Sequence, residues 1–431
     1  MKKVFSLAAI FCLGFALALQ AQDVPANAKA AKKGGGKNAK APKAAGAADA
    51  ANLEKGAPAG FRKLNPGDKA PAFSLPGIDG KTYTLADFKD APVLMVVFLS
   101  NHCPVSHAVE PRIIRFVDEM KTRGVAVVAI NPNHPDAVRI DELGYSKYND
   151  SFDEMKLYAR ETGFNFPYLY DGETQRTSAA FGCLATPHVF IFDKERALRY
   201  SGRFDDSRYA DAGTITAHDA RAATEEILAG KPVTTPETRP MGCSTKWLSK
   251  IPEVAKAEEA WKHRPVTLET IDDAGVAALV KNGTGRYRLI NVWATWCAPC
   301  VREFPGFVKF SRQFTNRDFE FVSISIDDPG EQAQVLKFLQ ARHAGMPDRL
   351  ARALKAEGRN TTNYLHTGAK TDALAKALDP AWDGPVPYTI LVAPDGEIIY
   401  RQSGEISIAA LREKLSQVLG TSYQPPASVG R

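Results

Sequence analysis

The chain is organised around the stretch Val292-Trp293-Ala294-Thr295-Trp296-Cys297-Ala298-Pro299-Cys300. An apolar run over residues 287–293 leads into it, and apolar residues at helical spacing follow it at Val301, Phe304, Phe307 and Val308. The pattern predicts a buried strand that runs into a helix whose N-terminus carries both sulfurs. The positive end of a helix stabilises a thiolate and lowers the pKa of a cysteine there. We therefore expect Cys297 to face solvent and attack a disulfide, and Cys300, one turn on, to resolve it.

Other uses of a Cys-x-x-Cys are less consistent with the surrounding residues. A zinc site usually needs a second Cys/His pair at ligand spacing, and none is nearby. Haem attachment requires a histidine directly after the motif, where Val301 stands. A structural disulfide remains an alternative, although one this short closes little chain. We predict a redox-active pair, with no metal and no organic cofactor.

The first residues of the chain carry a targeting pattern. Residues 1–21 combine Lys2 and Lys3 with an apolar run over residues 4–19 and small residues at its end. This predicts a secretory signal peptide, because the run is short for a membrane-spanning anchor. Export to a periplasm, a cell envelope or the exterior would place the chain where disulfides persist.

The next segment is rich in Ala, Lys, Gly and Pro, and we predict that residues 22–60 form a disordered basic tail. Seven lysines against two acids give residues 24–58 a charge of +5, and residues 1–23 add +1 to the total of +6. The remaining sequence is therefore nearly neutral, and we expect no nucleic-acid partner. The tail is interpreted as a solvated tether, with contact to an anionic surface as the alternative.

A second strand-to-cysteine junction precedes the first along the chain. The apolar run 93–99 is followed by Ser100-Asn101-His102-Cys103-Pro104-Val105-Ser106, with helical spacing at Val109, Ile113, Phe116 and Met120. Apolar strands at 125–130 and 189–192 then follow. Because this order of elements repeats in the C-terminal half, the sequence predicts an α/β fold with two similar units in tandem, each a central sheet flanked by helices.

The C-terminal unit resembles the exported thiol-disulfide oxidoreductases of the thioredoxin superfamily, the TlpA/ResA-like group, over roughly residues 265–425. Trp296-Cys297-Ala298-Pro299-Cys300 and Val301-Arg302-Glu303-Phe304-Pro305 carry this resemblance. It implies a thioredoxin fold with a mixed sheet, and a cis-proline opposite the cysteines that holds the substrate peptide. Pro387, just before an apolar strand, is the candidate.

The same resemblance implies roles for further residues. Glu303 matches an acid that assists proton transfer in this group, and it would manage the proton on Cys300. Asn291 stands where cytosolic thioredoxins carry a buried aspartate, and its side chain cannot titrate. Trp296 is expected at the rim of the site, and Trp293 in the core.

The N-terminal unit resembles a redoxin/peroxiredoxin-like branch over roughly residues 65–250. Asn101-His102-Cys103-Pro104 and Gly242-Cys243-Ser244-Thr245-Lys246-Trp247 carry the resemblance, which makes Pro187 the second cis-proline candidate. Ser106 replaces a thioredoxin's second cysteine. Typical peroxiredoxins carry Pro-x-x-x-Thr/Ser-x-x-Cys; here Ser100 supplies the hydroxyl, but Val96 replaces the proline. We predict domains at 61–235 and 265–425, joined by a linker over 236–264.

Cysteine counting leaves the partner of Cys103 open. After removal of residues 1–21 five cysteines remain, and Cys297 and Cys300 pair by proximity. Cys243 is the first choice as a second thiol for Cys103, because both lie in the stretches that carry the resemblance. Cys183 is the alternative, unless it is a buried small apolar residue. Nearby basic residues are candidates for a positive charge beside Cys103: His102 and Arg112.

These observations predict an exported thiol-disulfide oxidoreductase that acts as a reductase through Cys297 and Cys300. Its partners would be disulfide-containing envelope proteins and an upstream thiol electron donor. A second hypothesis is a thiol peroxidase in which Cys103 reduces peroxide and the C-terminal pair recycles it. A third is that the N-terminal unit is a redox-inert binding module.

Overall fold

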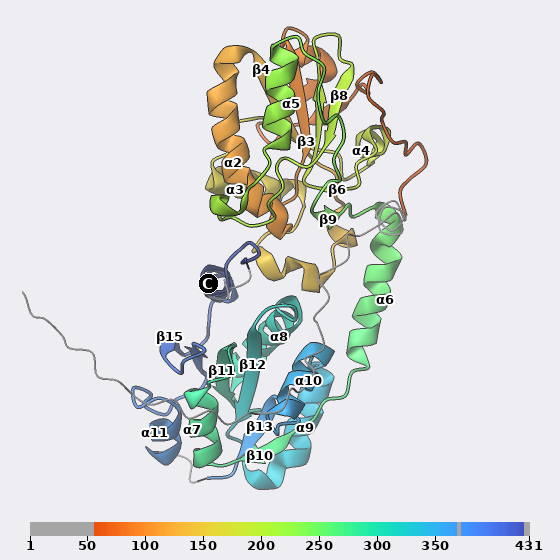
Figure 1. The fold of residues 1–431 in the computed structure, drawn as a ribbon. Helices are drawn as coiled ribbons and strands as arrows, with labels where there is room; N and C mark the ends of the chain where they lie inside the picture. Colours follow the sequence, from red (N-terminus) through yellow and green to blue (C-terminus); the bar gives the residue numbers. More distant parts are fainter. Residues whose placement is uncertain (1–55, 369–371, 426–431) are drawn as a thin grey trace, which may run out of the picture. The chain divides into compact units, whose positions relative to one another are not determined.

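The computed structural model describes residues 56–368 and 372–425. The predicted signal peptide and nearly all of the predicted basic tail lie outside the described residues. Two mixed β-sheets, one of five strands and one of six, form the centres of two successive domains (Figure 1). The tandem α/β architecture predicted from the two strand-to-cysteine junctions is confirmed.

The first sheet is built around a fully buried central strand, β3. Its order is β5-β4-β3-β7-β8, in which the first three strands are parallel, β7 runs antiparallel to β3, and β8 runs antiparallel to β7. All six residues of β3 are buried, as expected for a continuous apolar run covered on both faces. The strands are β3 (Val93–Phe98), β4 (Val125–Asn131), β5 (Tyr168–Tyr170), β7 (His188–Phe192) and β8 (Leu198–Gly202).

Successive side chains of β3 point to opposite sides of the sheet. Both faces therefore present apolar side chains, and both are covered. Val93, Met95 and Val97 face one apolar cluster, and Leu94, Val96 and Phe98 face the other. The first face is covered by α2 (Pro104–Met120), α3 (Phe152–Thr162) and α5 (Asp219–Leu228). The second is covered by α4 (Arg176–Phe181) and the hairpin of β1 (Ser74–Pro76) and β2 (Thr82–Thr84).

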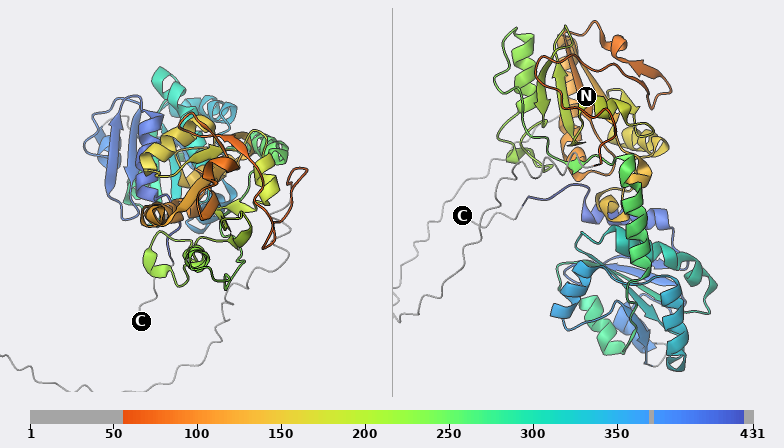
Figure 2. Two further views of the ribbon diagram at one scale, coloured as in Figure 1. Left: turned by 90° about the horizontal axis from the view of Figure 1, so that it is seen from above. Right: turned by 90° about the vertical axis from the view of Figure 1, so that its right-hand side faces the viewer.

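The predicted linker begins later than the sequence indicated. Within residues 236–250, β9 (Cys243–Ser244) pairs with β6 (Ala185–Thr186) of the first domain, and Trp247 is fully buried. Burial of that large apolar ring fixes the segment to the first domain. The connection is α6 (Ile251–Lys262), a single helix without a buried residue (Figure 2).

The second sheet has the order β10-β13-β12-β11-β14-β15, in which β14 alone runs antiparallel to the other five strands. Its central strand β11 is the apolar run predicted from the sequence. The strands are β10 (Glu269–Ile271), β11 (Tyr287–Trp293), β12 (Phe319–Ser325), β13 (Asn363–His366), β14 (Tyr388–Val392) and β15 (Ile398–Ser403).

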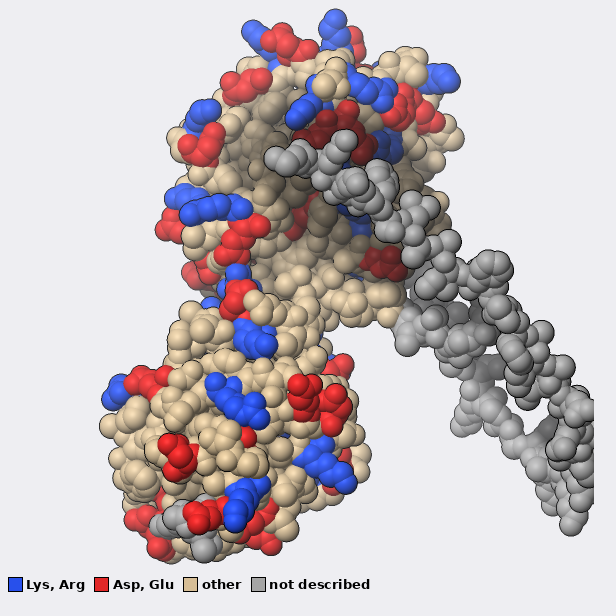
Figure 3. Space-filling view, turned by 90° about the vertical axis from the view of Figure 1, so that its left-hand side faces the viewer, with Lys and Arg blue, Asp and Glu red and all other residues tan. Residues whose placement is uncertain are grey.

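Two groups of helices complete the second domain. One face of the sheet packs against α7 (Asp273–Lys281) and α11 (Asp372–Leu378). The other packs against α8 (Ala298–Gln313), α9 (Gln332–Ala341) and α12 (Ile408–Leu419), and α10 (Asp348–Ala356) precedes β13. Within the described residues, no helix has both the length and the apolar character needed to span a bilayer. Acidic and basic side chains are interspersed on the face shown in Figure 3.

Candidate active site

A disulfide joins Cys297 to Cys300 at the start of α8, which follows β11 in the chain. Cys297 is the N-cap residue of α8, and the backbone N–H of Cys300 donates to its sulfur at 3.3 Å. The N–H groups of a first helical turn have no partner within the helix, so they are available to a negatively charged sulfur. The predicted placement of both sulfurs at a helix N-terminus is confirmed.

The prediction that Cys297 faces solvent is wrong. The residue is only 5% exposed, whereas its neighbour Trp296 is 65% exposed. The Cys297 sulfur lies 3.6 Å from the carbonyl oxygen of Val386, and the following peptide bond to Pro387 is cis, as predicted. The loop before β14 therefore covers the sulfur, while Trp296 lies on the surface beside it.

A buried carboxylate that sequence reasoning missed holds the loop before Cys297. Asp327 accepts hydrogen bonds from the backbone N–H of Thr295 at 3.0 Å and from its hydroxyl at 2.6 Å. Asp327 has no exposed surface. The sequence held one signal for this contact: an aspartate follows the apolar strand 319–325 directly, which places it at the same sheet edge as Thr295. This contact fixes the turn that carries Trp296 and Cys297.

Glu303 lies one turn after Cys300 on α8 and is almost fully buried. Its carboxylate accepts the backbone N–H of Ile406 at 2.8 Å and the side-chain amide of Asn291 at 3.3 Å. Burial raises the pKa of Glu303 to about 7, against these two hydrogen bonds, which lower it. The carboxyl can therefore take up or release a proton near neutral pH.

We expect this raised pKa to make stability depend on pH through Glu303. The folded protein keeps a proton on the carboxyl up to about pH 7, whereas the unfolded chain releases it near pH 4.5. Stability contributed by the protonated form is complete below pH 4.5 and is lost as the pH rises to about 7. Relative to Glu303→Gln, the wild type should lose about 2–3 kcal/mol across this window. Urea unfolding at several pH values measures this, and parallel profiles for the two proteins would contradict it.

Cys103 occupies the corresponding position in the first domain. It is the N-cap residue of α2 and has no exposed surface. Its sulfur lies 2.9 Å from the carbonyl oxygen of Thr186, and the Thr186–Pro187 bond is cis, as predicted. The backbone N–H of Cys243 donates to the Cys103 sulfur at 3.4 Å. The structure thus brings together the two cysteines that the sequence favoured as partners.

A buried charge pair lies beside Cys103. His102 Nδ1 is 2.6 Å from Asp150 Oδ2, and neither side chain is exposed. Burial disfavours a charged imidazole, but the Asp150 carboxylate outweighs it and raises the pKa of His102. Three more groups donate to Asp150: the Asn101 N–H and the amides of Asn131 and Asn133. Sequence reasoning singled out His102 but missed Asp150.

This pair affects the state of the Cys103 sulfur. Burial alone would raise the pKa of the Cys103 thiol. The hydrogen bond from the Cys243 thiol and the positive charge of His102 outweigh burial and lower the pKa well below its ordinary value. The same hydrogen bond raises the pKa of Cys243, which keeps its proton. Ionisation is therefore favoured at Cys103 and disfavoured at Cys243.

Two other candidates near Cys103 have different partners. Cys183 is fully buried, and its sulfur contacts the Ala185 carbonyl and the Thr245 hydroxyl at 3.4 and 3.5 Å. Burial raises its pKa to about 12, so it is a buried thiol rather than a partner of Cys103. Arg112 forms an ion pair with Asp205 at 2.7 Å, and its charge is directed there instead of at the sulfur.

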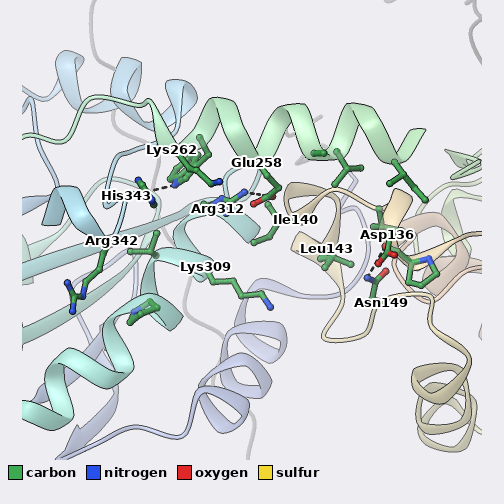
Figure 4. A pocket seen from close by; sticks show the side chains of 18 residues that line it. Asp136, Ile140, Leu143, Asn149, Glu258, Lys262, Lys309, Arg312, Arg342 and His343 are labelled. Atoms are coloured by element: carbon green, nitrogen blue, oxygen red, sulfur yellow. Dashed lines mark hydrogen bonds and ion pairs between the residues drawn. The ribbon is translucent and has the colours of Figure 1, made fainter. Parts of the chain in front are cut away.

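One cavity lies away from both sulfur sites. It has a volume of about 690 Å³ and is lined by parts of residues 135–149, α6 and α8, with the Glu258–Arg312 ion pair in its wall (Figure 4). No cysteine lines it. Among residues 56–368 and 372–425, no cluster of three or more His, Cys, Asp or Glu side chains could hold a metal ion.

Comparison with known proteins assigns a family to each domain. Residues 66–201 match the family model described as AhpC/TSA family, and residues 250–418 match the one described as Redoxin. The chain is 21% identical to thiol-disulfide oxidoreductase ResA of Bacillus subtilis, over 31% of this chain and 62% of that protein. It is 24% identical to the chloroplastic peroxiredoxin Q of Populus jackii, over 35% of this chain and 67% of that protein.

A solved structure is similar as well. The hypothetical protein SMc02350 of Sinorhizobium meliloti is 36% identical, covering 43% of this chain and 96% of that chain with a TM-score of 0.39. The chain spans less than two thirds of the Bacillus relative's length. Each family match covers one of the two sheets described above and its cysteine-bearing helix start. The chain is therefore a tandem of an AhpC/TSA-family domain and a Redoxin-family domain, both built on the thioredoxin fold.

Proposed function

We propose that the protein is an exported thiol-disulfide oxidoreductase that reduces disulfides through Cys297 and Cys300. In the reduced form, the Cys297 thiolate attacks one sulfur of a substrate disulfide, and the other sulfur leaves as a thiolate. Cys300 then attacks the Cys297 sulfur, which releases the second substrate sulfur and forms the disulfide seen here. Two enzyme thiols are oxidised and one substrate disulfide is reduced. The observation that carries this proposal is the disulfide at the N-terminus of α8.

Neighbouring groups would assist this exchange. The cis-proline loop at Val386 and Pro387 lies against the Cys297 sulfur, where the peptide of a substrate would bind. Trp296 offers an exposed apolar ring beside it. Glu303 would accept the proton of Cys300, because its pKa of about 7 lets it act near neutral pH. The oxidised pair would then need an upstream thiol donor to return it to the dithiol.

Export rests on the sequence of residues 1–21, which resembles a cleaved signal peptide. In an envelope or extracellular setting the substrates would be proteins that contain disulfides. We propose such proteins as partners. Secretion of a reporter fused to residues 1–21, with loss of those residues from the mature product, tests the export step.

The exchange itself is tested with insulin disulfides as the substrate and dithiothreitol as the electron donor. The full chain should accelerate insulin reduction over dithiothreitol alone, and no acceleration would overturn the assignment. The direction is tested by the reduction potential of Cys297–Cys300. A strongly negative potential supports a reductase, whereas a potential near those of known oxidants, about −120 mV, would overturn that direction.

We expect Trp296 to act in substrate binding rather than in the chemical steps. An exposed tryptophan beside a reactive group is the kind of side chain that carries binding energy. Trp296→Ala should raise the KM for insulin about 5- to 30-fold, equivalent to 1–2 kcal/mol, and change kcat little. Leu157→Ala, at another exposed apolar residue, is the control. A fall in kcat with an unchanged KM would place Trp296 in the chemistry instead.

A second candidate function is peroxide reduction by Cys103. The lowered pKa of Cys103 and the similarity to a peroxiredoxin favour it. The C-terminal pair would recycle the oxidised Cys103, and the covalent link between the domains would raise the effective concentration of this reductant. Peroxide consumption by the wild type and by Cys103→Ser decides the matter, since equal rates would exclude the peroxidase. If the N-terminal domain has no redox activity, no thiol reagent should modify Cys103 at neutral pH.

A further inference from the structure

The segment 421–425, which follows α12, lies against the first domain beside the helix start that carries Cys103. The Thr421 carbonyl oxygen is 2.8 Å from Nδ1 of His107, and Nε2 of the same imidazole is 2.7 Å from the Asn101 carbonyl oxygen. His107 is one turn after Cys103 and donates its backbone N–H to the Cys103 carbonyl at 3.1 Å. One imidazole therefore connects this segment to the backbone on both sides of Cys103.

Tyr423 attaches the segment to the first domain through its backbone and its ring. Its backbone pairs with Tyr209 as an isolated parallel bridge, and the preceding residue, Ser422, is buried. The Tyr423 ring packs edge-on against Tyr145 with the two centroids 5.0 Å apart, and the Arg208 guanidinium lies 4.2 Å from its centroid. Both ring contacts are favourable, because the face of an aromatic ring is negative and its edge is positive. The segment is therefore packed on the first domain.

The Tyr423 ring also lies near the two sulfurs of the first domain's site. Burial raises the pKa of the Tyr423 hydroxyl, and the nearby Cys243 and Cys103 sulfurs raise it further, to about 12. Cys103 has no exposed surface, whereas Tyr423 and Cys243 are partly exposed. The tyrosine is therefore part of the boundary that separates the Cys103 sulfur from solvent.

The second domain fixes the start of this segment through Arg317, in the turn after α8. The Arg317 guanidinium donates to the Gly144 carbonyl at 2.6 Å and to the Gly420 carbonyl at 2.9 Å. It also lies 3.8 Å from the centroid of the Tyr145 ring, against which Tyr423 packs. One side chain of the second domain thus contacts both the base of the segment and the surface that receives it.

We propose that the segment 421–425 completes the Cys103 site and that Tyr423 determines the size of the reactant that reaches this sulfur. A small reactant reaches the sulfur through local movement of the tyrosine ring, whereas a bulky one requires the segment to lift. One backbone bridge and a few side-chain contacts hold the segment, so it can open while both domains stay folded. The inference does not depend on the chemistry at Cys297 and Cys300, because neither residue belongs to this site.

The proposal is tested by stopping the chain after Gly420, in a background that carries Cys297→Ser and Cys300→Ser. The native protein is treated at neutral pH with N-ethylmaleimide or fluorescein-5-maleimide, which carry the same reactive group on a small and a large body. Labelling of Cys103 is followed by peptide mass. The truncation should raise the rate about tenfold or more with fluorescein-5-maleimide, and about threefold or less with N-ethylmaleimide, because only the large reagent needs the whole segment to open.

Two controls accompany the truncation. A chain stopped after Pro425 keeps the segment, and its labelling rates should stay within about twofold of those of the unshortened chain. Cys183 reports on folding, because this buried thiol of the same domain stays unlabelled as long as the domain is intact. With Cys183 unlabelled, an equal gain for the two reagents, or no gain with fluorescein-5-maleimide, would overturn the proposal.

The role of the ring is tested by point variants that keep the whole segment. Tyr423→Ala should reproduce most of the gain with fluorescein-5-maleimide. Tyr423→Phe is the matched variant and should keep the rates of the unsubstituted chain, because the contacts with Tyr145 and Arg208 are made by the ring and not by the hydroxyl. If Tyr423→Ala labels Cys103 no faster than Tyr423→Phe does, Tyr423 does not determine which reactants reach the sulfur.

Discussion

Replacement of Cys297 by serine is expected to lower the rate of insulin reduction by a factor on the order of 10³ or more. A thiolate is the nucleophile of disulfide exchange, and a serine hydroxyl is not ionised at neutral pH. The 5% exposure of Cys297 does not oppose this role, because the exposed Trp296 and the cis-proline loop lie directly beside it. The measurement is insulin reduction by the full chain with dithiothreitol as donor.

The matched variant Cys300→Ser separates attack from resolution. Cys297 can still attack, but without Cys300 the mixed disulfide with the substrate should persist and be visible on a non-reducing gel. Cys183→Ala controls for the loss of a thiol elsewhere, and its rate should equal that of the wild type, because Cys183 is a buried thiol in the other domain. Accumulation of the mixed disulfide in Cys297→Ser instead of Cys300→Ser would reverse the assignment of the two sulfurs.

The parts of the fold that the sequence predicted depend on local patterns. The runs 93–99 and 287–293 change from continuous apolar residues to helical spacing at a cysteine, and both junctions have the predicted form. The two cis-prolines were identified through the family resemblance, and both peptide bonds are cis. Both signals, a local change in the period of the apolar residues and a motif at fixed spacing, can be read from residues that are neighbours in the sequence.

The parts that were missed depend on contacts between distant segments. The loop that buries Cys297 lies 89 residues away from it, and Asp150 lies 48 residues from His102. No periodicity links such positions, so neither contact could be inferred from spacing. Strand β9 was assigned to the linker because two residues are too few to show a strand pattern. Its place on the first domain is determined by its pairing with β6 and by the burial of Trp247.

Among the charged side chains near Cys103, Asp150 should contribute most to the stability of the first domain. Asp150→Ala would remove the carboxylate that keeps the buried His102 charged, and it would leave the donors of Asn101, Asn131 and Asn133 without an acceptor. Removing one member of a buried ion pair typically costs about 3–5 kcal/mol. We expect a loss of this size in the free energy of opening of β3 and β4, measured by amide hydrogen exchange.

Two further variants distinguish the charge of Asp150 from its hydrogen bonds. Asp150→Asn keeps a carbonyl acceptor and nearly the same shape, so it should recover part of the stability. Without the negative charge, however, His102 should become neutral, and the pKa of Cys103 should rise, which would slow its alkylation near neutral pH. Asp136→Ala, at a largely exposed aspartate, should change the opening free energy by no more than about 0.5 kcal/mol. If Asp150→Asn retains both the wild-type stability and the wild-type Cys103 reactivity, the carboxylate charge has no part in holding the Cys103 thiolate.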